Sequence, residues 1–333
     1  MKPTLLLSAG VDFSATSPLH YTLCWDNKYA HTGHCKGPQY LYTLESGNEF
    51  EIHQFVNLRR KGNRARKPAI LSHDSEYCRF DGEDFFRKDM SIDRYINYFL
   101  THWNYIREDG FQAVADFSNK TSDCSVQFLE SVREEICKSF NVKVVMVVRD
   151  PVRRLFSISN KVCRIAIEND WYPNTGYIES YNKRNRIIQD EKMFRFMSKG
   201  TINKMDPKEL IREASKPNRI SSCDYSGRFK KMQHVFGKEN CHCIIMEQFF
   251  SGDVKSKQDL SNFLEYQIDK VHENVYTPDM GSNAPHYEYL SDQWTSDYVD
   301  MDDDTYNICY KNMKDIYEDF ERTFGYIPEE WGK

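Results

Sequence analysis

The sequence has no long hydrophobic run, no closely paired cysteines of the C-x-x-C type and no excess of basic residues. The first apolar stretch, at residues 4–7, is far too short for a signal peptide or a membrane span, so we expect a cytoplasmic protein with neither. The net charge of −5 argues against a nucleic-acid partner, because proteins that bind nucleic acid are normally basic.

The ten cysteines are scattered along the chain, and their spacing does not favour a metal site. Cys241 and Cys243 flank His242 within a strand-like segment. Because neighbouring residues of a strand point to opposite faces, His242 is directed away from both sulfur atoms, which is poor zinc geometry. We therefore expect reduced cysteines and no bound metal.

The composition is that of a folded globular protein. Hydrophobic residues make up 40% of the 333 positions and charged residues 29%, which allows a sizeable core and excludes general disorder. Strand-like segments are predicted at 4–8, 29–32, 112–117, 142–148 and 242–246. Apolar spacing predicts helices at 123–140, 191–197, 207–214, 227–236, 256–266 and 307–324.

This alternation predicts a P-loop-like three-layer α/β fold, with a central parallel sheet of about five strands flanked by helices. The whole chain, 1–333, is expected to be a single domain. Between residues 158 and 222 the sequence is polar and helical only in patches, so this part is expected to be a helical insertion beside a substrate cleft.

The segment 142–157, V-K-V-V-M-V-V-R-D-P-V-R-R-L-F-S, is the most informative one. A β-branched run suited to a buried strand leads into Asp150, a helix N-cap, and Pro151, a first-turn residue. Arg149 then lies at the carboxyl end of the strand and Ser157 two turns into the helix. Ligands bind at this edge of α/β sheets, and an arginine with a hydroxyl suits a phosphate group. The alternative is an ordinary turn with Arg149 in a surface ion pair.

The first predicted strand leads into a second candidate loop, in which Thr16 or Ser17 can cap a helix and Pro18 can occupy its first turn. Backbone N–H groups of such a loop can hold a phosphate or sulfate. Measured against a Walker A loop, Ala15 replaces a glycine and Thr16 the lysine. A P-loop kinase, which needs that lysine, is therefore a minor alternative. The candidate binding residues of this loop are Asp12, Phe13, Ser14, Ala15, Thr16 and Ser17.

Four segments in order resemble the sulfotransferase family, whose donor is 3′-phosphoadenosine 5′-phosphosulfate (PAPS). The segment 149–157 matches the R-D-P-x-x-R-x-x-S pattern, and the loop 10–17 is similar to the family's 5′-phosphosulfate-binding loop. The residues 225–247 are similar to the Y-x-x-x-L…F…I-x-x-x-Y-E block. The segment 36–41 looks like the K-E-x-H-F/Y-F stretch of the heparan-sulfate-type, carbohydrate-modifying members.

The resemblance implies a PAPS-dependent transfer that needs no metal, with a carbohydrate or small-molecule hydroxyl as the acceptor. It assigns the 3′-phosphate of the nucleotide to Arg149 and Ser157. It also implies contact of Tyr225 with the adenine, for which the alternative is a core tyrosine. Ser282 and Asn283 belong to a late loop that corresponds to one that folds over the nucleotide in the family.

The chain departs from the family pattern at three positions. Phe13 stands where the family's loop carries a lysine that stabilises charge on the bridging oxygen of the leaving phosphate. Gly37 stands where the K-E-x-H stretch has its glutamate, often the base, and Gln39 where it has its histidine. These departures favour a second hypothesis, a catalytically impaired relative that binds the nucleotide or a sulfated ligand without turnover.

The remaining candidates for acid–base chemistry follow the second predicted strand. We expect His34 or His31 to act as the base, and Lys36 to compensate for the missing loop lysine. His20 is a further candidate base, and Asp116, at the end of the third predicted strand, is expected to face the acceptor. The alternatives are surface-turn residues for the histidines and the lysine, and a cap or ion pair for Asp116.

Overall fold

The computed structural model describes residues 2–11, 14–33, 39–46, 90–159, 206–217, 223–272 and 301–332. The chain divides into two compact units, each formed by two segments. Unit 1 comprises Met1–Val148 and Arg228–Glu288, and unit 2 comprises Arg149–Gly227 and Tyr289–Lys333. The expectation of one domain with an insertion around 158–222 stays a prediction.

Unit 1 contains a five-stranded sheet in which every pairing is parallel, with the strand order β2-β3-β1-β4-β5. The predicted α/β fold with a central parallel sheet is thus confirmed. The five predicted strands are all present, with ends that differ by at most one residue. The bounds are β1 (Thr4–Ser8), β2 (Ala30–His31), β3 (Ala113–Asp116), β4 (Asn141–Val148) and β5 (Cys241–Ile245).

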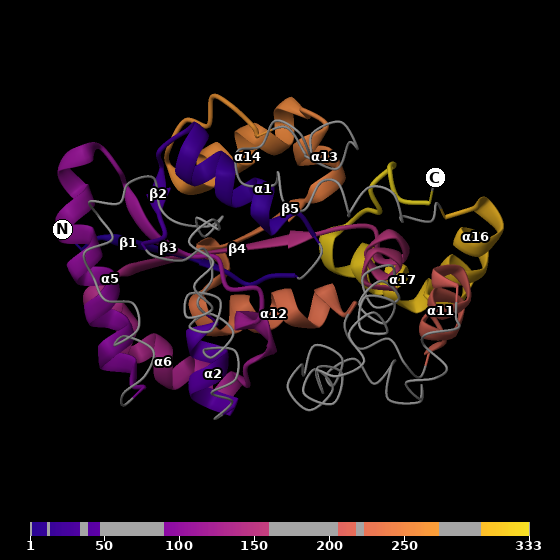
Figure 1. Ribbon diagram of the computed structural model, residues 1–333, viewed down its shortest axis with the longest axis horizontal. Helices are drawn as coiled ribbons and strands as arrows, with labels where there is room; N and C mark the ends of the chain where they lie inside the picture. Colours follow the sequence, from indigo (N-terminus) through magenta and orange to yellow (C-terminus); the bar gives the residue numbers. More distant parts are fainter. Residues whose placement is uncertain are drawn as a thin grey trace, which may run out of the picture. The chain divides into compact units, whose positions relative to one another are not determined.

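Helices cover both faces of the sheet, as Figure 1 shows. Above the strands in that view lie α1 (Thr16–Tyr21), α13 (Met246–Phe250) and α14 (Val254–Leu264). Below them lie α6 (Val126–Ser139) and the part of α12 (Tyr225–Phe236) that follows Arg228. The other helices of unit 1 within the described residues are η1 (Thr22–Asp26), α2 (Tyr40–Ser46), α5 (Ile92–Ile106), η2 (Arg107–Asp109), η3 (Thr121–Asp123) and η6 (Lys238–Asn240).

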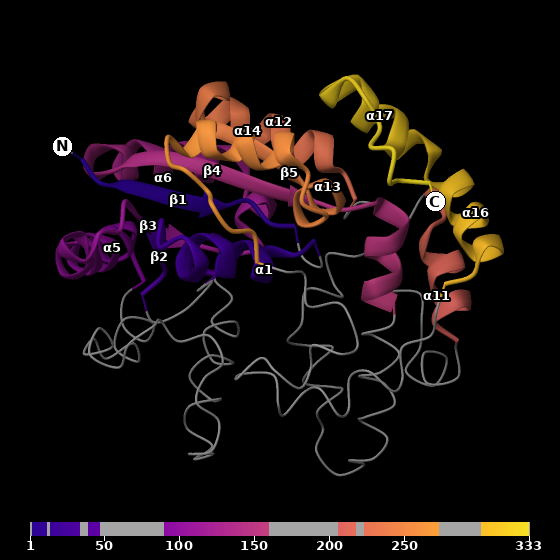
Figure 2. The same ribbon diagram turned by 90° about the horizontal axis from the view of Figure 1, so that it is seen from above.

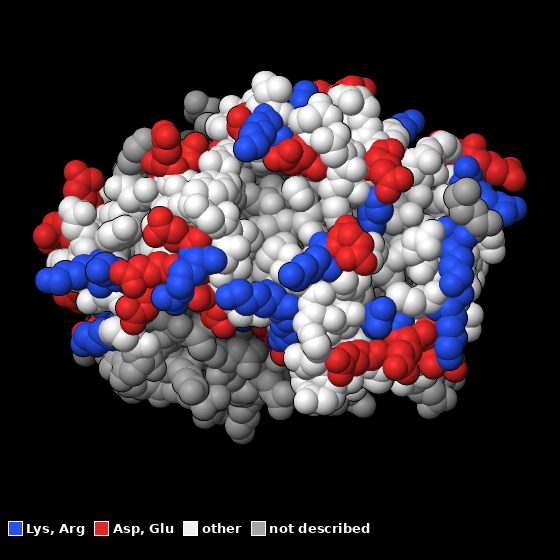
Figure 3. Space-filling view, turned by 180° about the vertical axis from the view of Figure 1, so that it is seen from behind, with Lys and Arg blue, Asp and Glu red and all other residues white. Residues whose placement is uncertain are grey.

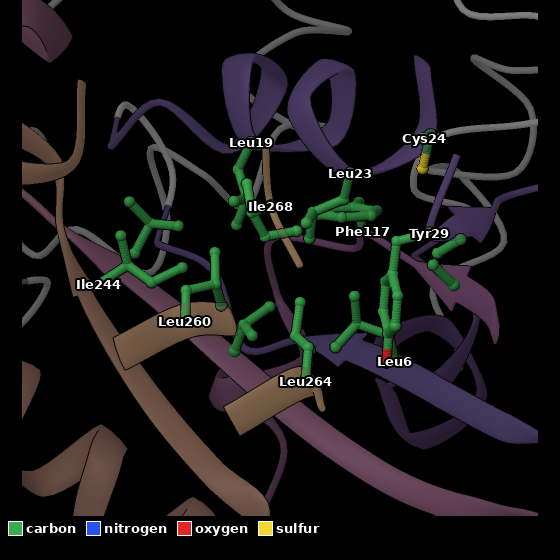
Figure 4. Close-up of a cluster of buried hydrophobic side chains, with 14 of the residues drawn as sticks. Leu6, Leu19, Leu23, Cys24, Tyr29, Phe117, Ile244, Leu260, Leu264 and Ile268 are labelled. Atoms are coloured by element: carbon green, nitrogen blue, oxygen red, sulfur yellow. The ribbon is translucent and has the colours of Figure 1, made fainter. Parts of the chain in front are cut away.

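The core on the α1 and α14 face is a cluster of aliphatic and aromatic side chains (Figure 4). Leu19 and Leu23 from the first helical segment meet Leu6 of β1 and Leu260 of α14 within it. Side chains of this size each stabilise the fold by about 1.5–3 kcal/mol when fully buried. Leu5 and Leu7, which alternate with Leu6 along β1, are buried as well, so the sheet is covered on both faces. This packing fixes the position of the carboxyl ends of the strands.

Unit 2 is helical in the residues that the structure describes. After β4 a helix covers residues 151–159, and the others are α11 (Pro207–Ala214), α16 (Asp303–Asn312) and α17 (Lys314–Phe324), seen in Figure 2. The prediction of one closing helix at 307–324 is wrong in one respect, because Met313 leaves the helical conformation and separates α16 from α17. Because the Met313 side chain is buried, the apolar spacing continues across this break, and the sequence pattern alone does not reveal where one helix ends and the next begins.

Basic and acidic side chains are interspersed on the face of the molecule in Figure 3. The ion pairs among the described residues agree with this view, for example Lys138–Glu135 in unit 1 and Lys208–Asp302 in unit 2. In the part of the chain that the structure describes, no helix combines the length and the apolar character needed to cross a bilayer.

Candidate active site

The strand-to-helix junction after β4 has the geometry that the sequence predicts. The Asp150 side chain accepts a hydrogen bond from the backbone N–H of Arg153 at 2.9 Å, which is an N-cap contact, and Pro151 opens the helix. Arg149 Nη1 donates to Ser157 Oγ at 2.8 Å, and that hydroxyl donates to the Arg153 carbonyl at 3.1 Å. The guanidinium and the hydroxyl therefore lie side by side, in the arrangement that suits a phosphate group.

Asp150 has a role beyond the cap, which the sequence does not reveal. It is fully buried and accepts hydrogen bonds from Tyr306 Oη at 2.6 Å, from Tyr317 Oη at 3.2 Å and from the Gly332 N–H at 3.3 Å. Burial, followed by the nearby Asp150 charge, raises the pKa of both tyrosines. The carboxylate thus fixes the start of helix 151–159 to the last helices of the chain, and with it the position of Arg149.

Two further residues that the family resemblance singles out are buried in unit 2, one in the segment 149–157 and one at the start of α12. Arg154 is 2% exposed and its Nη1 lies 3.4 Å from Cys223 Sγ. Tyr225, expected to contact adenine, is 1% exposed, and its ring packs near Phe320 and Trp331 with centroids 6.5 Å apart in each case. This surrounding matches the core role that the sequence left open, and an adenine contact stays a prediction.

The loop after β1 in unit 1 continues along β4 before it turns. The Val11 N–H donates to the Val147 carbonyl at 3.0 Å, and the Val147 N–H donates to the Gly10 carbonyl at 2.8 Å. Ser14 is fully buried, and its Oγ has no hydrogen-bond partner among the described residues. Since buried hydroxyl groups are almost always paired, this atom is a candidate for binding a ligand.

The prediction that Thr16 or Ser17 caps the first helix is wrong. Both residues lie within the first turn of α1, and Ala15 is the N-cap, with a left-handed backbone (φ 59°) and no side-chain cap. Ala15 occupies the place of a glycine in the Walker A spacing, and its positive φ is the conformation for which glycine is normally chosen. Asp12 and Phe13 lie outside the described residues.

His31 ends β2 and forms a buried pair with His102 of α5. The His31 Nδ1 atom lies 2.5 Å from His102 Nε2 and accepts from the Gly33 N–H at 3.1 Å. With its Nδ1 lone pair engaged by Gly33, the neutral ring of His31 carries its proton on Nε2. A ring fixed in this way is a poorer base at Nε2, and the identity of the base stays a prediction.

Of the other candidates, His20 and Asp116 are buried. The Nε2 atom of His20 lies 3.3 Å from Thr32 Oγ1. The Asp116 carboxylate accepts from Tyr95 Oη at 2.8 Å and from both the backbone N–H and the hydroxyl of Ser118. Burial raises the pKa of Asp116, and these hydrogen bonds oppose the shift. His34, Lys36, Ser282 and Asn283 lie outside the described residues.

No group of three or more His, Cys, Asp or Glu side chains suited to a metal ion occurs among the residues that the structure describes. Comparison with family models and with curated proteins gave no match.

Solved structures do resemble the chain. A sulfotransferase from Alicyclobacillus acidocaldarius matches with 14% identity over 100% of both chains and a TM-score of 0.50. A sulfotransferase domain from the curacin biosynthetic pathway matches with 13% identity over 93% of this chain and 97% of that one, with a TM-score of 0.39. Sulfotransferase STF9 from Mycobacterium avium matches with 12% identity, over 98% and 78%, and a TM-score of 0.40. Together with the parallel five-stranded sheet, the first likeness shows that this chain has the α/β fold of the sulfotransferases.

Proposed function

We propose that this protein is a sulfotransferase that moves the sulfuryl group of PAPS to a hydroxyl of a carbohydrate or small molecule. The observation that carries the proposal is the contact between Arg149 Nη1 and Ser157 Oγ at the end of β4. It supplies a fixed positive charge and a hydroxyl next to each other, which a phosphate monoester binds through charge-assisted hydrogen bonds. The fold supports the same proposal.

The residues present fit the nucleotide in two respects. Arg149 and Ser157 suit the 3′-phosphate, because the guanidinium can donate to its oxygens and the Ser157 hydroxyl can turn to the phosphate the proton that it donates to the Arg153 carbonyl. Ser14, in the loop that resembles the 5′-phosphosulfate loop, offers a buried hydroxyl without a partner among the described residues. The roles of Asp12, Phe13, Ala15, Thr16 and Ser17 in this loop are part of the proposal, as are those of Ser282 and Asn283.

When bound, PAPS supplies an activated sulfuryl group. In the transfer, the acceptor oxygen forms a bond to sulfur, the bond from sulfur to the bridging oxygen breaks, and its electron pair stays on the departing phosphate. The chain must take up the acceptor proton and neutralise the phosphate charge. We assign the proton to His34, with His31 and His20 as the other candidates.

The buried network of Asp116 supports a different role from the one expected for it. Its carboxylate is occupied by Tyr95 and Ser118, and Ser118 Oγ in turn accepts from the Gln39 N–H at 2.8 Å. We therefore propose that Asp116 positions Gln39 at the start of α2, directly after the segment that holds His34 and Lys36.

Calorimetric titration with 3′-phosphoadenosine 5′-phosphate (PAP), the product nucleotide, tests the proposal. Arg149→Ala should weaken PAP binding by about 2–4 kcal/mol, as the loss of a charge-assisted phosphate contact does. The matched control is Arg153→Ala, an exposed arginine of the same helix outside the R-D-P-x-x-R-x-x-S positions, which should leave the affinity unchanged. Equal affinity of wild type and Arg149→Ala contradicts the assignment of the 3′-phosphate.

The same titrations separate the alternatives. Binding of Mg-ATP in preference to PAP indicates the P-loop kinase. Binding of PAP without transfer of labelled sulfate to any of a panel of hydroxyl acceptors indicates the nucleotide-binding relative, which Phe13, Gly37 and Gln39 favour.

A further inference from the structure

The backbone at Gln39 is held in an uncommon conformation by the segment that follows β3. Gln39 has a φ of 53°, in the left-handed region that residues other than glycine rarely occupy. Its N–H donates to Ser118 Oγ at 2.8 Å, and its side-chain Oε1 accepts from the Lys120 N–H at 3.2 Å. Residues held in such sparsely populated conformations cluster at binding and catalytic sites, so Gln39 is a candidate for a direct ligand contact.

The same contacts fix the direction of the Gln39 carboxamide. Because its Oε1 atom accepts from the Lys120 N–H, its Nε2 atom is directed away from that N–H and has protons to donate. Ser118 is itself held by the buried Asp116 carboxylate, to which both its backbone N–H and its hydroxyl donate. A donor that is fixed before the ligand arrives loses little conformational entropy when it binds.

A second carboxamide belongs to the segment that holds Gln39. Asn119 stands between Ser118 and Lys120, and its Oδ1 atom is buried without a hydrogen-bond partner among the described residues. Buried polar atoms are almost always paired in native proteins, so a donor on a bound molecule is expected to reach this oxygen. Since the residues on either side of Asn119 both contact Gln39, the two carboxamide residues are neighbours in space.

These two residues lie beside the loop that resembles the 5′-phosphosulfate loop. Gly10 of that loop has a φ of 94°, and a Cβ atom placed on it would overlap the carbonyl oxygen of Asn119. Glycine is therefore required where the two segments touch. The strands β1 and β3 pair in parallel, so both segments leave the sheet at its carboxyl edge, where ligands of α/β proteins bind.

We propose that Gln39 and Asn119 bind the acceptor and select a neutral molecule with neighbouring hydroxyl groups, such as an uncharged sugar ring. A hydroxyl next to the reacting one donates its proton to Asn119 Oδ1. Gln39 Nε2 donates to an oxygen of the same acceptor. This inference rests on the proposed function and narrows its acceptor to one chemical class.

The chemistry of the Asn119 oxygen sets this class. An amide oxygen can only accept, so it needs a partner with an O–H or N–H group. Sulfate, phosphate and carboxylate groups are ionised at neutral pH and have no proton to give. Such a group next to the reacting hydroxyl would leave Asn119 Oδ1 buried and unpaired, which disfavours anionic polysaccharides. A neutral sugar hydroxyl satisfies the atom.

Transfer of labelled sulfate from PAPS to a set of probes tests the acceptor class. The probes are methyl glucoside, its monodeoxy analogues, p-nitrophenol and heparan sulfate. Wild type should prefer the glucoside to at least one monodeoxy analogue by about tenfold or more in kcat/KM, because that analogue leaves a buried polar atom unpaired. Heparan sulfate, which is anionic, should be a poorer acceptor than the glucoside.

Two variants connect this preference to the two carboxamides. Asn119→Leu should raise the KM of the glucoside about tenfold, abolish its advantage over the deoxy analogue and leave PAP affinity unchanged. Gln39→Glu keeps an oxygen for the Lys120 N–H but loses the amide protons, so it should also raise this KM. Gln112→Leu, at an exposed carboxamide directly before β3, is the matched control and should change neither value.

Thermal unfolding of each variant separates a local effect from misfolding, and the comparison of probes on wild type needs no variant. An unchanged preference in Asn119→Leu, or a loss of PAP affinity in it, overturns the role of Asn119 while the proposed function stands. Transfer to p-nitrophenol or heparan sulfate with none to the glucoside overturns the acceptor class in the same way. Failure of wild type to bind PAP overturns the proposed function and this inference together.

Binding of the glucoside decides the case in which PAP binds and no probe is sulfated. Saturation-transfer NMR on the PAP complex measures this binding without turnover. A glucoside signal that Asn119→Leu weakens supports the inference, and the absence of a signal with wild type overturns it.

Discussion

At the scale of single residues, the site after β4 depends on a carboxylate that binds no ligand. Asp150 is fully buried, and two tyrosine hydroxyls and two backbone N–H groups donate to it. A buried carboxylate is tolerated only when its oxygens are hydrogen-bonded, so each donor supports the others. The orientation of Arg149 is therefore set by residues that stand more than 150 positions further along the chain.

Tyr306→Phe tests this dependence. The variant removes the shortest hydrogen bond to Asp150 and should lower the free energy of unfolding by about 1.5–3 kcal/mol, the usual value for a bond to a charged group. Urea denaturation measures the change. Tyr310→Phe, one turn further along α16, is the control and should differ little from wild type. Equal stability of the two variants would show that the Asp150 contacts contribute nothing to folding.

At the scale of the elements, the start of α1 is set by backbone conformation. Ala15 adopts a left-handed conformation, which costs a residue other than glycine about 1–2 kcal/mol. Its methyl group is buried in the core cluster and stabilises the fold by about 0.8 kcal/mol. A glycine at this position would relieve the strain, but the burial of the methyl group would be lost. It would also lower the stability by about 0.4–1 kcal/mol, because the unfolded chain gains conformational entropy.

These values predict that Ala15→Gly changes the free energy of unfolding by no more than about 1 kcal/mol. Ala15→Val should destabilise by about 2 kcal/mol or more, because a β-branched residue is a strong outlier at positive φ. Thermal and urea unfolding of the pair give the comparison. A valine variant as stable as wild type would mean that this loop has another backbone conformation in solution.

The elements themselves follow closely from local sequence, whereas much of the site does not. The apolar run of β4, and Asp150 and Pro151 after it, predict the strand, the turn and the meeting of Arg149 with Ser157, because all these signals lie within one short segment. The contacts of Asp150 with Tyr306 and of Gln39 with Ser118 join segments far apart in the chain. No periodicity or capping pattern encodes them, so they become visible only in the fold.

At the scale of the whole molecule, one histidine links stability to pH. His242 in β5 is half-buried and stacks on Phe263 with ring centroids 5.1 Å apart. Burial lowers its pKa from 6.5 to about 4, while Asp259 opposes the shift. Between these two values the unfolded chain binds a proton that the folded chain does not, so stability is complete above pH 6.5 and is lost as the pH falls toward 4.

His242→Gln removes this proton linkage and should flatten the fall in stability on the acid side. A difference of one between the folded and unfolded pKa corresponds to about 1.4 kcal/mol, so wild type should lose up to about 3 kcal/mol more than the variant between the two pKa values. Urea denaturation at a series of pH values measures the difference. Above neutrality the two curves should run parallel, and parallel curves throughout would contradict the assignment.

The order of the strands in the sheet determines when each strand finds its partner during synthesis on the ribosome. β4 pairs with β1 on one side and with β5 on the other, but the chain builds the first part of unit 2 before it returns to β5. During synthesis, the β5 side of β4 therefore lacks its partner for roughly 5–20 s, the time that ribosomes need from Val148 to Cys241. Such a bare hydrophobic edge recruits other strands, so a chain that stalls or is cut short in this interval should be the form that aggregates.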